Sequence, residues 1–231
     1  MTTAKLTQLN KQEVLRYLGY REQALSLQLE EQIDRSISLA LELAHPRSVY
    51  RRFKRNGAET PPAEELLLGC DIQEHLADSE EMILLAATVG SDLDHEIRRQ
   101  QSLNMSFAVI LDAAASTAIE AYLDLLEDQM RADFLQEGLY LTSRFSPGYG
   151  DLPLTIQGDL LRILDSHRKI GLAVGAGGLM NPIKSVSCIM GLSRQGFGKT
   201  KDPCEICSNR DNCGLRRRGG YCGKFRSNEI S

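Results

Sequence analysis

The sequence predicts an α+β fold, in which an antiparallel sheet is flanked by helices. Two long segments, 21–44 and 106–135, have the spacing and composition of helices. The continuous apolar run 82–89 is typical of a buried strand. The apolar segments 170–174 and 184–192 are separated by a glycine-rich connection, which predicts two further strands. Strands interspersed among several helices in this way favour an α+β domain with an antiparallel sheet.

The N-terminal part of the chain is predicted to begin with helices. Residues 11–18 favour a short helix, and 21–44 a long amphipathic one. The apolar positions of the long helix recur every four residues: Leu25, Leu29, Ile33, Ile37 and Leu41. Such a stripe is typical of a helix that faces the core. His45-Pro46 ends this helix, residues 48–54 follow as a strand, and Asn56-Gly57 as a turn.

The middle of the chain continues with helices around the predicted buried strand. Residues 71–76 and 92–99 favour short helices on either side of it. The helix over 106–135 is rich in alanine and is interrupted by neither glycine nor proline. A further helix is predicted over 160–167, after a turn at 144–151.

Length and composition set the class of protein. The chain has 231 residues, of which 42% are hydrophobic and 25% charged, which is ordinary for a globular protein. We expect one domain over 1–195 and a small appendage over 196–231. No apolar segment is long enough to span a membrane, and the N-terminus lacks the apolar core of a secretory signal. The sequence therefore predicts a cytoplasmic protein.

The appendage is predicted to bind a metal. It contains four clustered cysteines: Cys204, Cys207, Cys213 and Cys222. In a reducing cytoplasm such a cluster favours a metal site over disulfides, and zinc or an iron–sulfur cluster both accept four thiolates. Redox-active thiols or a disordered tail are the alternatives. Cys70 and Cys188 stand alone and are expected to be small core residues.

The charge of the appendage differs in sign from that of the rest of the chain. Residues 196–231 carry eight basic and four acidic side chains, a balance of +4, whereas the whole chain has a net charge of −4. This asymmetry suggests docking to an acidic partner, and a merely solvated tail is equally compatible with it. Nucleic-acid binding is a minor alternative, because the tail has no interleaved aromatic residues and no recognition helix.

The turn at 144–151 is the main candidate for a binding site. Its sequence is Arg144-Phe145-Ser146-Pro147-Gly148-Tyr149-Gly150-Asp151. Pro147 fixes its own φ and Gly148 can adopt a positive φ, so the backbone has a defined shape. Such a turn can present Arg144 as a carboxylate clamp and Tyr149 as a lid over a small polar ligand. An ordinary turn between two elements is the alternative.

An acidic pair precedes this turn on the predicted helix over 106–135. Asp112 and Glu120 are eight residues apart and therefore lie on roughly the same face. They are either a solvated or helix-capping pair, or Glu120 points toward the turn. In the second case its carboxylate could hold an ammonium group or ribose hydroxyls.

Other kinds of site have weaker support. The glycine run 174–178 would suit a dinucleotide-binding loop only if it opened a helix, but Asn181-Pro182 interrupts it at once, which favours a tight strand connection. The histidines share no metal-ligand spacing and are expected at the surface or at helix caps: His45, His75, His95 and His167. No hydrolase or phosphate-loop motif occurs.

The segment 142–192 resembles the activation domain of cobalamin-dependent methionine synthase. The resemblance consists of an R-x-x-P-G-Y turn at 144–149, a spacer helix, Ile170-Gly171 and a P-x-x-S-V-S segment at 182–187, in that order. It extends more loosely back to Leu68, where free-standing bacterial forms of the domain have similar residues. These residues are Asp71-Ile72, His75-Leu76, Ala86-Ala87-Thr88-Val89-Gly90, Asp112-Ala113 and Glu120.

The resemblance implies a ligand. That domain binds S-adenosylmethionine through its R-x-x-P-G-Y turn and acidic residues from elsewhere. Arg144, Ser146, Gly148 and Tyr149 match the turn, and Glu120 is our choice for the acidic partner. Arg144 would engage the methionine carboxylate, Tyr149 would cover the adenine or sulfonium, and backbone groups of Ser146 and Gly148 would contact the adenine edge.

The resemblance also implies a role. The chain would be a free-standing activation subunit that offers the methyl group of S-adenosylmethionine to the corrinoid of a cobalamin-dependent methyltransferase, with a flavodoxin or ferredoxin as electron donor. The chain has no D-x-H-x-x-G cobalamin signature, so the corrinoid would reside on the partner. The family has Thr-Glu-Ser where Gly175-Ala176-Gly177 stands here. This difference leaves room for a non-catalytic protein that senses S-adenosylmethionine.

Overall fold

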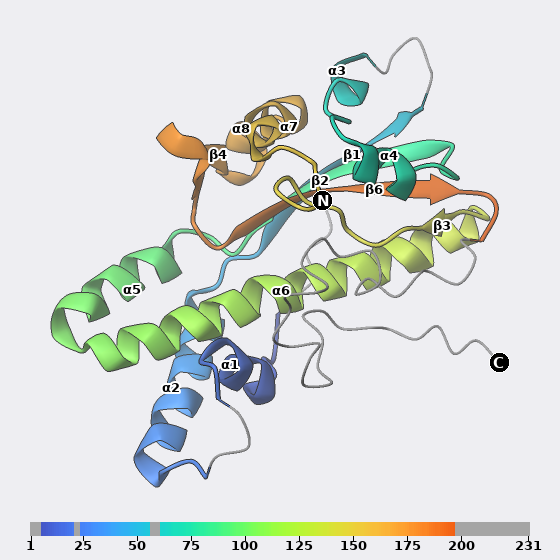
Figure 1. Ribbon diagram of the computed structural model, residues 1–231. Helices are drawn as coiled ribbons and strands as arrows, with labels where there is room; N and C mark the ends of the chain where they lie inside the picture. The colour runs from blue at the N-terminus through green and yellow to red at the C-terminus, as the bar shows by residue number, and fades with distance from the viewer. Residues whose placement is uncertain (1–5, 21–23, 56–60, 197–231) are drawn as a thin grey trace. The chain divides into compact units, whose positions relative to one another are not determined.

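The computed structural model describes residues 6–20, 24–55 and 61–196. Their central element is a four-stranded antiparallel sheet with the order β1-β2-β6-β3 (Figure 1). Its strands are β1 (Arg47–Lys54), β2 (Glu81–Thr88), β6 (Ser185–Ser193) and the two-residue β3 (Tyr140–Leu141). The predicted α+β class with an antiparallel sheet is therefore confirmed for these residues.

Helices cover one face of the sheet and form the larger core. They are α1 (Lys11–Tyr17), α2 (Leu27–Leu43), α5 (Asp92–Leu103) and the long α6 (Met105–Gln136). Alternate side chains of the central strands, including Ile83, Leu85, Cys188 and Met190, point to this side and pack in one cluster with α6. The predicted stripe of α2 also packs here, with Ile33 fully buried.

The opposite face of the sheet carries a second core. Met82, Leu84 and Ile189 point to this side. The covering helices are α3 (Pro61–Glu64), α4 (Cys70–His75), α7 (Gln157–Leu164) and α8 (Ser166–Ile170), and Figure 1 shows α7 and α8 on the side of the sheet opposite to α6. Because β2 and β6 are buried on both faces, β2 is apolar along nearly its whole length, as the sequence predicted.

Local capping explains where several helices begin and end. The Ser26 hydroxyl accepts a hydrogen bond from the Leu29 amide at 3.3 Å, so α2 begins at Leu27 and not at residue 21. Asn104 caps α6 in the same way. The predicted helix over 160–167 is divided between α7 and α8, because Asp165 adopts a left-handed conformation with φ 54°.

The segment 170–174 corrects one expectation. The sequence predicts a strand over 170–174, but Ile170 ends α8, and Gly171 follows in a left-handed conformation. Only Ala173–Val174 (β4) is extended, and it pairs with Met180–Asn181 (β5) in a separate two-stranded sheet. The glycine-rich residues between these strands form a short 3₁₀ turn, η2 (Ala176–Gly178), which confirms the tight connection.

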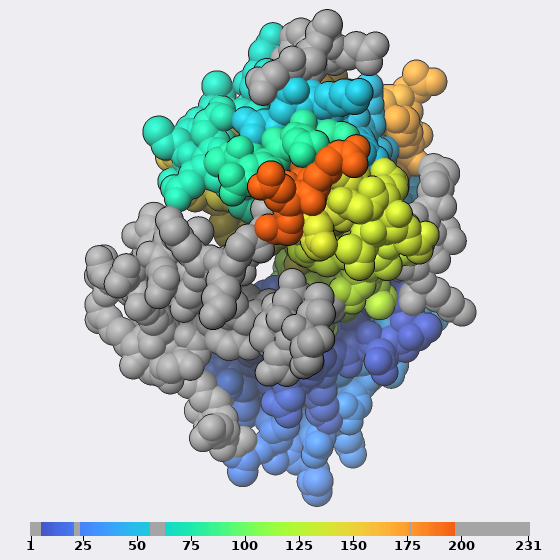
Figure 2. Space-filling view, turned by 90° about the vertical axis from the view of Figure 1, so that its right-hand side faces the viewer, coloured from blue at the N-terminus to red at the C-terminus, as the bar shows by residue number. Residues whose placement is uncertain are grey.

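The short edge strand of the main sheet, β3, was not predicted from the sequence. It follows α6 directly and pairs with the last residues of β6. In Figure 2 the end of β6 (orange) lies at the surface between the C-terminal turns of α6 (yellow-green) and the turquoise segment that contains α4. No helix of the described residues is both long and apolar enough to cross a membrane. The predicted turn at Asn56-Gly57 and the cysteine-rich tail lie outside the described residues.

Candidate functional site

The turn at 144–151 continues the edge of the main sheet beyond β3. Phe145 forms an antiparallel bridge with Ile189 of β6, with both backbone hydrogen bonds present at 2.8–2.9 Å. The chain then reverses, and the Tyr149 amide donates to the Ser146 carbonyl at 3.0 Å. Gly148 has φ 90°, a conformation that favours glycine at the third position of such a turn. The structure thus gives the predicted turn a fixed place on the sheet edge.

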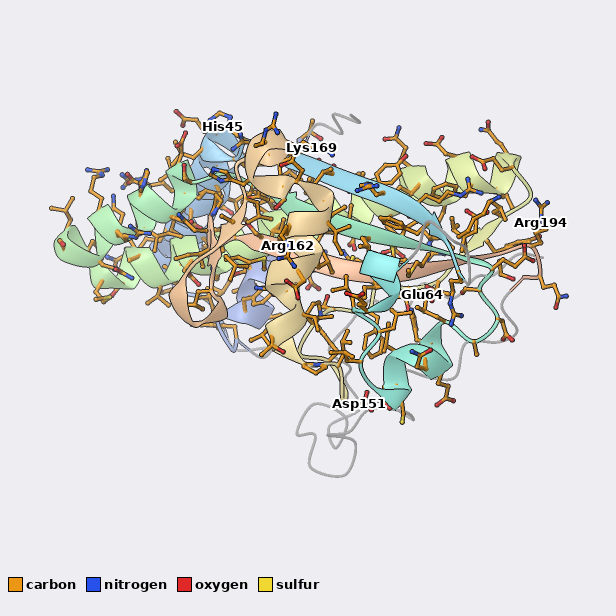
Figure 3. All side chains as sticks on the ribbon, turned by 90° about the horizontal axis from the view of Figure 1, so that it is seen from above. His45, Glu64, Asp151, Arg162, Lys169 and Arg194 are labelled. Carbon is orange, nitrogen blue, oxygen red and sulfur yellow. The ribbon has the colours of Figure 1, made fainter. Side chains whose placement is uncertain are left out.

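A reciprocal set of hydrogen bonds fastens the far end of this turn to α4. The Asp151 carboxylate accepts from the amides of Cys70 at 2.6 Å and Asp71 at 3.1 Å, and the Asp71 carboxylate accepts from the Asp151 amide at 3.1 Å. Figure 3 shows Asp151 beside α4. A Cβ at Gly150 would lie 2.1 Å from Asp71 Oδ2, and one at Gly69 would lie 2.3 Å from Asp151 Oδ1. Both glycines are therefore required for this close approach.

His75, the last residue of α4, contacts the turn and the residues just before it. Its Nε2 lies 3.0 Å from the Ser143 carbonyl oxygen and 3.1 Å from Thr142 Oγ1. Its ring packs against the Phe145 ring, with centroids 5.2 Å apart, and Phe145 in turn contacts the Tyr149 ring at 6.4 Å. Burial lowers the pKa of His75, and the hydrogen bond with Ser143 opposes this only in part. His75 is the last residue of α4 and is partly buried, and its contacts with the turn were not predicted from the sequence.

Arg144 projects from the opposite side of the backbone, toward α6. Its guanidinium faces three carboxylates on successive turns of that helix: Asp124 at 3.2 Å, Glu127 at 3.2 Å and Glu120 at 3.6 Å. These acids follow the i, i+4, i+7 spacing of one helical face. Nη1 of Arg144 is buried and has no hydrogen-bond partner among the described residues. The described residues therefore do not use the full donor capacity of this guanidinium.

The ionisation of this cluster reflects burial and mutual attraction. Burial alone would lower the pKa of Arg144, but Glu127 and Glu120 outweigh it and the pKa is raised. Burial raises the pKa of Glu120, and Arg144 opposes the rise. Cys188, fully buried on the neighbouring strand, has its pKa raised by burial to about 12. Arg144 is therefore held as a cation among carboxylates.

The structure brings two of the predicted site residues together and places a third on the Phe145 side of the turn. Arg144 and Glu120 are neighbours, and Tyr149, with an exposed fraction of 66%, stands at the surface of the turn. The Gly148 amide, expected to contact adenine, instead donates to the Leu152 carbonyl at 2.9 Å. That amide is therefore committed within the turn in this arrangement.

Other predicted residues lie elsewhere. Asp112 does not join Glu120 but pairs with Lys184 at 2.8 Å, and Cys70 is exposed instead of lying in the core. Cys188 is buried, as expected. The proposed metal ligands Cys204, Cys207, Cys213 and Cys222 lie outside the described residues. Within the described ranges, no group of His, Cys, Asp or Glu is placed to hold a metal ion.

Sequence reasoning missed Asp124 and Glu127. The signal was present, because acids at 120, 124 and 127 repeat at helical spacing on the face that was already suspected. The roles of Asp71 and Asp151 had no local signal, since these residues are 80 positions apart in the chain.

The α+β fold of the described residues is also found among solved structures. No protein-family model matches the chain, and no curated protein matches it. A crystal structure of the MetH reactivation domain bound to AdoHcy matches 89% of this chain and 76% of its own, with a TM-score of 0.55 and 15% sequence identity. The chain thus has the fold of that reactivation domain, as the resemblance implied.

Proposed function

We propose that this protein binds S-adenosylmethionine beside the 144–151 turn and serves as an accessory activation subunit of a cobalamin-dependent methionine synthase or a related corrinoid methyltransferase. The observation that carries the proposal is the neighbouring pair of Arg144 and Glu120, 3.6 Å apart at a sheet edge. A cation and a carboxylate side by side suit the two charges of an α-amino acid. The solved structure of the same fold, bound to AdoHcy, supports this choice of ligand.

Each residue has a defined task in this proposal. The Arg144 guanidinium, whose Nη1 has no acceptor among the described residues, donates to the ligand carboxylate, and Glu120, whose side chain is 46% exposed, accepts from its ammonium group. The exposed Tyr149 ring covers the adenine or the sulfonium, through stacking or cation–π attraction. Asp71 and Asp151 hold the turn in place. Ser146 and Gly148 shape the turn through their backbone.

The partner supplies the cobalt chemistry. Its corrinoid would provide a nucleophilic metal centre once an electron donor, a flavodoxin or a ferredoxin, has reduced it. This chain would contribute by holding the methyl donor in a fixed position against that centre. A tail that binds zinc or an iron–sulfur cluster through Cys204, Cys207, Cys213 and Cys222 would dock the partner or relay the electron.

A regulatory role is the second candidate. Gly175-Ala176-Gly177 replaces the polar trio of the methionine synthase pattern and forms the connection between β4 and β5. A protein that had lost those side chains could sense S-adenosylmethionine without supporting methyl transfer. Remethylation of a partner corrinoid protein in the presence of a reductant separates the two candidates, because a sensor would bind the ligand and give no methyl transfer.

Calorimetric titration of the full chain with S-adenosylmethionine tests the proposal. We expect saturable binding that is weakened about tenfold or more by Arg144→Lys, which keeps the charge but removes the planar fork. Arg162→Lys is the matched control, since Arg162 lies on α7, pairs with Asp159 and is well exposed (Figure 3). Absence of binding, both alone and with a corrinoid partner, would refute the proposal, as would binding that is insensitive to Arg144→Lys.

The metal-binding tail is tested separately. We expect the purified chain to contain zinc or iron in stoichiometric amounts, and the double variant Cys204→Ser, Cys207→Ser to lose it. Elemental analysis and the visible absorption of an iron–sulfur cluster distinguish the two metals. A metal-free protein that remethylates its partner at the full rate would exclude this part of the proposal.

A further inference from the structure

The short helix α4 contacts both ends of the 144–151 turn. Asp71 and His75 are four residues apart on this helix, so their side chains project from the same face. The Asp71 carboxylate accepts from the Asp151 amide at the far end of the turn, and the His75 ring lies against Phe145 at the near end. One face of α4 is thus placed to determine the position of the turn.

The imidazole of His75 makes polar contacts with the backbone that leads into the turn. Its Nε2 lies 3.0 Å from the Ser143 carbonyl oxygen and 3.1 Å from the Thr142 hydroxyl oxygen. That hydroxyl in turn accepts from the Gly191 amide of β6 at 2.7 Å. A carbonyl oxygen can only accept, so Nε2 carries the proton in the neutral ring. The hydrogen bond with Ser143 therefore fixes the orientation of the imidazole.

The same ring is the first of three aromatic side chains in contact. The ring centroids of His75 and Phe145 are 5.2 Å apart, and those of Phe145 and Tyr149 are 6.4 Å apart. Both distances lie in the range over which aromatic rings attract one another. The backbone of Phe145 is bridged to Ile189, so this bridge and His75 together set the place from which the Phe145 ring meets Tyr149.

The ring at the end of this row is the most exposed of the three. Tyr149 has an exposed fraction of 66%, and an exposed side chain has several accessible rotamers. A ligand that must itself order such a ring binds more weakly than one that meets it already in place. Contact with Phe145 restricts the Tyr149 ring before any ligand arrives.

We propose that His75 is a positioning residue for the ligand: acting through Phe145, it holds the Tyr149 ring in the orientation that covers the adenine or the sulfonium. The inference rests on the proposed function, in which that ring covers the bound ligand. His75 acts without touching the ligand, because Phe145 lies between its ring and that of Tyr149. Asp71, on the same face of α4, anchors the other end of the turn.

Two substitutions separate the ring of His75 from its hydrogen bond. His75→Phe keeps a ring against Phe145 and loses the bond with Ser143, whereas His75→Gln keeps an N–H donor and loses the ring. In calorimetric titration of the full chain with S-adenosylmethionine, we expect His75→Gln to weaken binding about three- to tenfold. His75→Phe should stay within about twofold of the unmodified protein. In a Tyr149→Ala background His75→Gln should have no further effect, because the ring that it positions is absent.

Fluorescence measures the order of the ring directly. The chain has no tryptophan, so Tyr149→Trp introduces a single indole at this position. The anisotropy of its emission should fall when His75→Gln is added and should be kept with His75→Phe. Ile33→Val is the control for a general loss of stability, because Ile33 is buried in the core on the opposite face of the sheet.

Several outcomes would overturn the inference. They are an affinity or an anisotropy that His75→Gln leaves unchanged, an equal loss of affinity in the Tyr149→Ala background, and an equal effect of Ile33→Val. An equal loss in His75→Phe and His75→Gln would also overturn it, because the hydrogen bond and not the ring would then be responsible. In each of these cases the unmodified protein still binds S-adenosylmethionine, and the proposed function stands. Failure of the unmodified chain to bind the ligand would refute the proposed function itself.

Discussion

Asp71 and Asp151 exchange hydrogen bonds across 80 residues of sequence, each carboxylate accepting from the backbone of the other. The N-terminus of α4 is therefore capped by a residue that is distant in the sequence. Gly69, the residue before the helix, has no side chain to accept from the first amides, and Asp151 takes this role for Cys70 and Asp71. The cap of one helix and the anchor of the ligand turn are therefore the same interaction.

Removal of this anchor should destabilise the protein and weaken ligand binding together. We expect Asp151→Ala to lower the free energy of unfolding by about 1–2 kcal/mol, because two amides at a helix N-terminus lose their acceptor. Asp71→Ala should cost less, since one amide is affected. The double variant should cost less than the sum of the two. Urea denaturation measures these values, with the exposed Asp133→Ala as control; additive costs would show that the two carboxylates act independently.

The glycine beside this anchor provides a second prediction. Gly150→Ala should destabilise the protein by about 1–3 kcal/mol, because its φ is 52° and the new Cβ would collide with the Asp71 carboxylate. Gly158→Ala is the control: it lies in α7 with nothing within 4 Å of an added Cβ, and should be neutral or stabilising by up to about 1 kcal/mol. Thermal unfolding compares the two. Equal stability of both variants would contradict the close approach of Gly150 and Asp71.

The partly buried His75 should make stability depend on pH. Its pKa is lowered from 6.5 in the folded protein, so the unfolded chain binds more protons as the pH falls below about 6.5. The contribution of His75 is therefore present above the unfolded pKa and is lost progressively on acidification. We expect His75→Gln to flatten the fall in unfolding free energy between about pH 7 and 5. The exposed His167→Gln should keep the profile of the unmodified protein, and an unchanged profile for His75→Gln would argue against the partial burial of His75 beside the turn.

The two cysteines of the described residues should differ in reactivity. Burial raises the pKa of Cys188 to about 12, so its thiolate is scarce near neutral pH, and the side chain is inaccessible. Cys70 is exposed at the start of α4. Peptide mapping after brief alkylation of the native protein should show modification of Cys70 at least about tenfold faster than of Cys188. Alkylation in denaturant, where both react, provides the control, and comparable rates in the native state would be inconsistent with the buried strand.

Local patterns of apolar residues in the sequence were sufficient to predict most of the helices and the buried strands. The stripe through Ile33 predicted the packed face of α2, and the apolar run through Leu84 predicted a strand buried on both sides. Both patterns are complete within one element, so burial of that element follows from them directly. The prediction of a strand over the whole of 170–174 was wrong. Ile170 is the last residue of α8, and the left-handed Gly171 ends that helix before the short strand β4 begins.

The sequence by itself also supplied the turn, with its fixed Pro-Gly geometry and its candidate residues Arg144, Tyr149 and Glu120. Only the tertiary structure decided their arrangement. The bridge between Phe145 and Ile189 sets the register of the turn on β6, and strand alternation then directs Arg144 to the α6 side, where Asp124 and Glu127 meet it. Contacts between elements depend on register and on helix rotation, which no short stretch of sequence encodes by itself.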